Sequence, residues 1–212
     1  MRKFFIAATM IILLLGACSK DLTLEQQLID TIASMNEKEK QGINYVGKLN
    51  QQEQKEQELF VGTMELTQEQ YSQVKKQVAA LKKSARERMV IVQKEEEALD
   101  ETRKTADDIA VLIDTVDQEK KKALEKFDQA LTERFNKHEQ LILEYKKLID
   151  AQTQLYTLLE DRTVRDSQLQ KQVKEVNHLT SVVQETIEQF NDETMEVNRL
   201  KSRILASLEE VK

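Results

Sequence analysis

The sequence predicts an all-α protein, an elongated antiparallel up-and-down four-helix bundle with coiled-coil-like packing. The 212 residues include no proline and only four glycines, so the chain lacks the residues that form most tight turns. It is rich instead in Gln, Glu, Lys, Leu and Ala, which lose little freedom in a helix. From Leu22 onward, apolar residues recur at alternating spacings of three and four, the pattern of helices with one buried face.

The first segment of the chain predicts a bacterial lipoprotein signal. Arg2 and Lys3 precede an apolar run of about a dozen residues, which is too short for a membrane-spanning helix of roughly 20 residues. The run ends in a lipobox pattern, Leu15, Gly16, Ala17 and Cys18.

This signal also predicts the domain organisation. We expect residues 1–17 to be removed and a diacylglyceryl group to be attached to Cys18. Residues 18–22 then form a lipidated tether to a single helical-bundle domain, residues 23–212. Two acyl chains give stable anchoring where one would be marginal, so the mature protein is expected on the extracytoplasmic face of the cell membrane.

Three breaks divide the domain into four helices. Gly62 is expected to close the first helix in the left-handed conformation, and Thr67 with Gln70 to form a capping box for the second. Acidic residues suited to a helix N-terminus start the third, and a cluster of capping residues starts the fourth. The predicted helices cover residues 21–61, 67–114, 117–160 and 165–210. At about 1.5 Å per residue they form a rod of roughly 60 to 70 Å.

Heptad repeats of apolar residues run along the second and fourth helices. In the second repeat, Arg88 and Glu95 replace apolar residues. We expect both to extend to the edge of the interface, with a buried polar site as the alternative. Because the apolar pattern continues through the middle break, an arrangement of three long helices is the alternative fold.

The first helix differs from the others. Gly42 and Gly47 are expected to permit close packing of a neighbouring helix, with a functional hinge as the alternative. After Leu49 the apolar pattern disappears, and residues 50–58 (NQQEQKEQE) are expected to be exposed or frayed.

The charge of the chain limits its partners. The formal net charge is −6 at pH 7, and removal of Arg2 and Lys3 with the signal peptide makes it −8. Nucleic acid is therefore not expected as a partner, because phosphate binding needs clustered cations. One local exception is a candidate binding face, with a solvated helix surface as the alternative interpretation: Lys75, Lys76, Lys82, Lys83 and Arg86.

The sequence contains no recognisable catalytic, cofactor or metal motif. The single cysteine is the expected lipidation site, and no GxSxG pattern occurs. His138 lies in register with apolar residues and is expected to be a hydrogen-bonded core residue. Glu175 and His178 have the spacing of a di-iron ligand pair, but helix three offers no second copy. We therefore predict neither an enzyme nor a bound cofactor or metal.

In its lipobox, its mature length of 195 residues, the segment QGINYVGKL at residues 41–49 and its proline-free remainder, the chain resembles the YkyA-like cell-wall-binding lipoproteins of Gram-positive bacteria. The resemblance covers essentially the whole chain and implies a four-helix bundle with a wall-binding role. Cys18, as the lipidation site, is the one functional residue that the resemblance assigns in this chain. Hydrolase activity, which is mentioned for the family, is not expected in this chain, because its sequence contains no recognisable hydrolytic motif.

These features together predict a non-enzymatic, membrane-anchored lipoprotein that binds a cell-wall component or an envelope protein through an exposed helix face. Two alternatives belong to other classes. One is a cell-wall hydrolase with an unrecognised carboxylate pair. The other is a chaperone-like envelope assembly factor, which a large exposed apolar groove would indicate.

Overall fold

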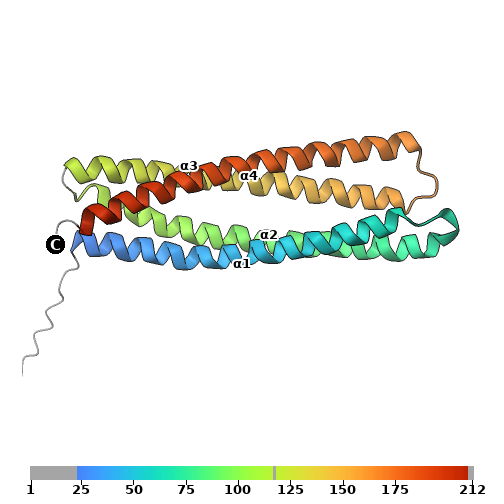
Figure 1. Cartoon of the computed structure of the whole chain (residues 1–212), viewed down its shortest axis with the longest axis horizontal. Coiled ribbons are helices and arrows are strands. Elements are labelled where there is room, and N and C mark those ends of the chain that lie inside the picture. Colours follow the sequence, from blue (N-terminus) through green and yellow to red (C-terminus); the bar gives the residue numbers. More distant parts are fainter. Residues whose placement is uncertain (1–22, 117, 210–212) are drawn as a thin grey trace, which may run out of the picture.

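The structure is a four-helix bundle, seen in a computed structural model that describes residues 23–116 and 118–209 (Figure 1). The predicted lipobox and Cys18 lie outside these residues. The chain forms α1 (Leu24–Met64), a short 3-10 turn η1 (Gln68–Gln70), α2 (Tyr71–Ile113), α3 (Gln118–Leu159) and α4 (Asp166–Glu209). Successive helices run in opposite directions along one rod, and the described residues contain no strand. The predicted fold is confirmed, and the three-helix alternative is wrong because α2 ends at Ile113.

The helix ends depend on side-chain caps. Thr23 Oγ1 accepts a hydrogen bond of 3.2 Å from the backbone N–H of Gln26 at the start of α1. Gln70 Oε1 accepts one of 3.1 Å from the N–H of Thr67, as the predicted capping box requires. The expectation for Gly62 is wrong, since α1 continues through it to Met64 and no described residue has a positive φ. Glu65, in a right-handed helical conformation, is the C-cap residue that follows α1.

Two hydrophobic cores lie one after the other along the rod. The first occupies the end that holds the start of α1, the α2–α3 connection and the end of α4, and it takes buried side chains from all four helices. The second lies toward the opposite end and takes its buried side chains from α2, α3 and α4 alone. The helix α1 contributes only half-buried residues to it, namely Leu49, Leu59 and Phe60.

The unequal contribution of α1 opens one edge of the bundle. Between Met35 and Met64, all of which the structure describes, α1 has no buried apolar side chain. Residues 50–58 remain helical and most of them are exposed, so the expectation of exposure is confirmed and that of fraying is wrong. Glu56 is the exception in this segment, with only 4% of its surface exposed. Close backbone packing joins α1 to α2, α2 to α3 and α3 to α4, whereas α1 and α4 make few close backbone contacts.

The glycines of α1 are not needed for close packing. A Cβ added at Gly42 would lie 4.0 Å from Glu95 Oε1, its nearest neighbour, and one added at Gly47 would meet nothing within 4 Å. Both positions can hold a side chain, so the packing expectation is wrong.

We expect Gly47→Ala to raise the free energy of unfolding by about 1 kcal/mol, because alanine loses less backbone entropy in a helix. Urea denaturation followed by circular dichroism measures this change. A lower free energy of unfolding than that of the wild type would contradict the open space around Gly47.

Candidate functional site

The candidate site is a groove along the open edge between α1 and α4. Two adjoining cavities of about 670 Å³ and 540 Å³ form it. They share the lining residues Asn50, Glu53, Leu148 and Thr180 and are therefore continuous. Residues 46–60 of α1 line one side, a length of about 20 Å at 1.5 Å per residue. We call this cavity the α1–α4 groove.

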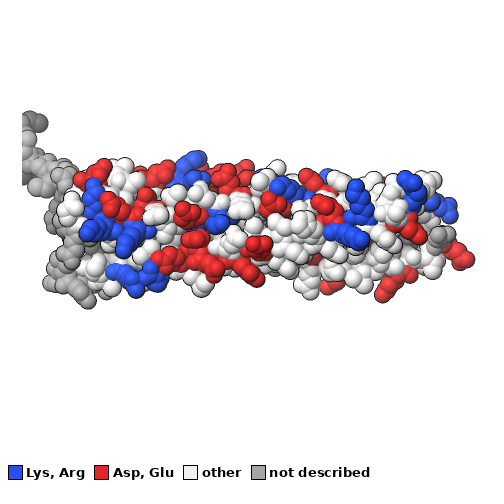
Figure 2. Space-filling model, turned by 90° about the horizontal axis from the view of Figure 1, so that it is seen from above, with Lys and Arg blue, Asp and Glu red and all other residues white. Residues whose placement is uncertain are grey.

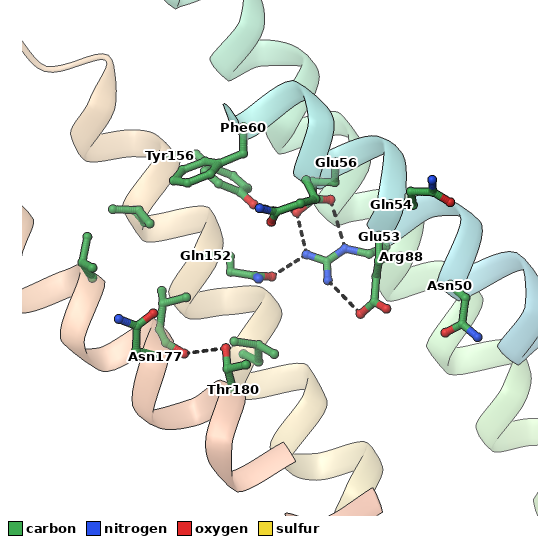
Figure 3. A pocket seen from close by; sticks show the side chains of 15 residues that line it. Asn50, Glu53, Gln54, Glu56, Phe60, Arg88, Gln152, Tyr156, Asn177 and Thr180 are labelled. Atoms are coloured by element: carbon green, nitrogen blue, oxygen red, sulfur yellow. Dashed lines mark hydrogen bonds and ion pairs between the residues drawn. The ribbon is translucent and has the colours of Figure 1, made fainter. Parts of the chain in front are cut away.

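Arg88 lies at the floor of the groove with only 2% of its surface exposed. Its guanidinium binds Glu56 through two hydrogen bonds, Nε to Oε2 at 3.0 Å and Nη2 to Oε1 at 2.7 Å (Figure 3). Such paired geometry is the strongest form of the arginine–carboxylate interaction. Arg88 therefore does not extend to the edge of the interface as expected, because α1 places a buried carboxylate opposite it.

Four more polar side chains complete this cluster. Tyr156 OH donates to Glu56 Oε1 at 2.6 Å, and Tyr145 OH accepts from Arg88 Nη1 at 3.1 Å while donating to Glu53. Gln152 Oε1 accepts from Arg88 Nη2. We call these six residues the Arg88 network: Glu53, Glu56, Arg88, Tyr145, Gln152 and Tyr156. The network joins α1, α2 and α3 where the second core lacks buried apolar residues from α1.

Burial sets the protonation of the network. It raises the pKa of both tyrosine hydroxyls well above the ordinary range, and the adjacent carboxylates raise each pKa further. Burial alone would lower the pKa of Arg88, but the hydrogen bond to Tyr145 and the negative charge of Glu56 outweigh burial, and the pKa is raised. At neutral pH the tyrosines are therefore uncharged donors around a charged arginine.

A second buried pair lies in the other half of the groove. His138 is 6% exposed, and its Nε2 lies 2.7 and 2.8 Å from the two oxygens of Glu95. The histidine ring packs on Phe190 with ring centroids 5.4 Å apart. The prediction of a hydrogen-bonded core histidine is confirmed. Glu95 turns inward to this partner instead of extending outward.

The rim of the groove is almost free of charge. Among the lining residues that the structure describes, Glu53 is the one charged side chain with substantial exposure, 39%. Six exposed amides occupy the two sides: Asn50, Gln54 and Gln57 on α1, and Asn177, Gln184 and Asn191 on α4. Elsewhere the rod is highly charged, and Figure 2 shows acidic and basic side chains interspersed along one of its faces.

The candidate basic face lies on α2, outside the groove. Lys75, Lys76, Lys83 and Arg86 are exposed, whereas Lys82 is half-buried and paired with Glu160. Lys83 Nζ lies 3.6 Å from Glu87. Acidic neighbours therefore reduce the positive field of this face.

The carboxylates of the groove are held by internal partners. Both oxygens of Glu56 accept hydrogen bonds from Arg88, and Oε1 also accepts one from Tyr156. Glu175 and His178 are exposed on α4. The described residues contain no cluster of three or more metal-ligating side chains. No helix within them combines the length and hydrophobicity that crossing a bilayer requires.

Comparison with known proteins places this structure in context. The model of the YkyA family, described as "Putative cell-wall binding lipoprotein", matches residues 23–206. No curated protein matches the chain. A solved structure that is similar is the 1.6 Å crystal structure of a conserved protein of unknown function from Staphylococcus aureus. It has a TM-score of 0.72 and 17% sequence identity, covering 83% of this chain and 88% of the other. This likeness shows a shared fold.

Proposed function

Because this chain belongs to the YkyA family, we propose that it is a lipid-anchored envelope protein that binds a cell-wall component through the α1–α4 groove. It acts by display and recognition, without catalysing a reaction. The observation that carries the proposal is the groove itself, a long concave surface at the one edge where the bundle does not close.

The expected lipid anchor sets the distance of the groove from the membrane surface. Cys18 precedes the start of α1 by only six residues, so acyl chains on it hold that end of the rod at the membrane surface. The groove begins near Val46, which is about 33 Å along α1 from Leu24. An upright rod therefore holds the groove beyond the lipid headgroups and toward the wall.

The groove supports wall binding better than the basic face does. Ligand sites are generally concave, with apolar walls and a few placed polar groups, and the groove has these features. The basic face is a convex helix surface that Glu87 and Glu160 partly neutralise. We therefore assign recognition to the groove and propose no binding role for the basic face.

Co-sedimentation with purified, insoluble cell walls tests this function. The variant Thr180→Trp fills the groove, since Thr180 lines both of its cavities. The matched control Gln170→Trp adds the same side chain to an exposed position of α4 outside the groove. We expect the wild type and the control to sediment with walls and Thr180→Trp to lose about tenfold in affinity or more.

Two results would contradict the proposal. Equal sedimentation of Thr180→Trp, with an unchanged circular dichroism spectrum, would exclude the groove as the binding surface. Failure of the wild type to sediment would exclude wall binding.

A further inference from the structure

We propose that the α1–α4 groove binds an uncharged, N-acetylated glycan strand that lies along the axis of the bundle. This inference rests on the proposed wall-binding function and names the chemistry of the ligand. Cell walls offer two chemically different kinds of polymer, uncharged glycan strands and polyanions. The side chains of the groove match the first kind.

The rim supplies hydrogen bonds without charge. A carboxamide side chain both donates and accepts, as the hydroxyl and acetamido groups of a sugar do. The six rim amides stand on both sides of the groove, so a ligand between α1 and α4 can be held from two directions. In a chain with 33% charged residues, the lining of the groove has one substantially exposed charge, that of Glu53.

The floor supplies apolar contacts beside these amides. Leu49, Val176 and Phe60 are half-buried and line the groove. An acetamido group carries a methyl next to its polar atoms, so it fits a site where an apolar floor meets an amide rim. The ring of Phe60, 6.1 Å from that of Tyr156, offers an apolar surface to the face of a sugar ring.

The charges of the groove disfavour the other kind of polymer. Arg88 is enclosed by Glu56, Tyr145 and Gln152 and offers no free positive charge to a ligand. Glu53, the one substantially exposed charge of the lining, is acidic. Glu53 would therefore repel a polyanion, and no free positive charge in the groove would offset this repulsion. The groove thus discriminates against polyanionic wall polymers.

Isothermal titration calorimetry of the full chain in detergent micelles tests the inference. The probe is the hexamer of N-acetylglucosamine, and the comparators are the matching glucose hexamer, which lacks acetamido groups, and poly(glycerol phosphate). We expect saturable binding of the probe, at least about tenfold tighter than the glucose hexamer, and no binding of the polyanion.

Paired variants locate the site. Asn50→Ala with Asn177→Ala removes an amide from each side of the groove and is expected to weaken probe binding about tenfold or more. Gln93→Ala with Gln170→Ala removes two exposed amides outside the groove and is expected to leave binding unchanged.

The outcomes separate this inference from the proposed function. If the probe does not bind, or binds no tighter than the glucose hexamer, the inference is overturned. If groove-dependent wall sedimentation persists in that case, the proposed function stands with a different ligand. If wall sedimentation is also absent, both fail.

Discussion

Glu56→Ala is expected to lower the free energy of unfolding by about 3 to 5 kcal/mol, because it leaves Arg88 buried without its main partner. Removing one member of a buried ion pair has a cost of this size, since the remaining charge stays desolvated. Here Arg88 is 2% exposed, and its guanidinium donates two hydrogen bonds to Glu56. Tyr156 OH also loses its acceptor.

Urea denaturation followed by circular dichroism measures the effect. Glu58→Ala is the matched control, because Glu58 lies two residues away on the same helix and is exposed. It is expected to change stability by less than about 0.5 kcal/mol. An equally small change for Glu56→Ala would show that the Arg88 network does not stabilise the bundle.

Cys18→Ala is expected to abolish anchoring, because Cys18 is the single cysteine of the chain and the expected site of the thioether-linked diacylglyceryl group with its two acyl chains. The variant should stay as the uncleaved precursor and carry no lipid. Two acyl chains hold a protein at a membrane through about 0.8 kcal/mol per buried CH₂, so their loss removes the main attachment of the mature chain.

Radiolabelled palmitate and mass spectrometry of membrane fractions measure this outcome. Ser19→Ala, which keeps the thiol, is the control and should be labelled and processed like the wild type. Palmitate incorporated into Cys18→Ala would contradict the assignment of this residue.

The fold could be predicted from the sequence because helix formation depends on local features. Spacings of three and four, the absence of proline and the Thr67–Gln70 cap are each read within a few residues, and the structure confirms four helices. The end of α1 is harder to predict from the sequence, because a glycine such as Gly62 adopts a helical conformation as readily as the left-handed one. The helix therefore continues to Met64.

The groove could not be predicted, because it depends on which residues face one another across helices. In the sequence, Arg88 interrupts the apolar repeat of α2, and residues 50–58 of α1 have no apolar repeat. Each observation alone is what an exposed helix surface would also produce. Glu56 and Arg88 are 32 positions apart, and only their pairing turns two exposed segments into one buried network. Polar residues that interrupt facing helices at the same height are the signal that would have indicated it.

Photo-crosslinking in intact cells tests most directly that the groove of the anchored protein contacts the wall. A photoreactive residue is placed at Asn177 in the groove, at Lys76 on the basic face or at Gln170 outside both. We expect Asn177 to yield cross-linked wall fragments, which a glycan-cleaving enzyme shortens, and the other two positions to yield none. Wall fragments attached at Lys76 or Gln170 but not at Asn177 would contradict the account.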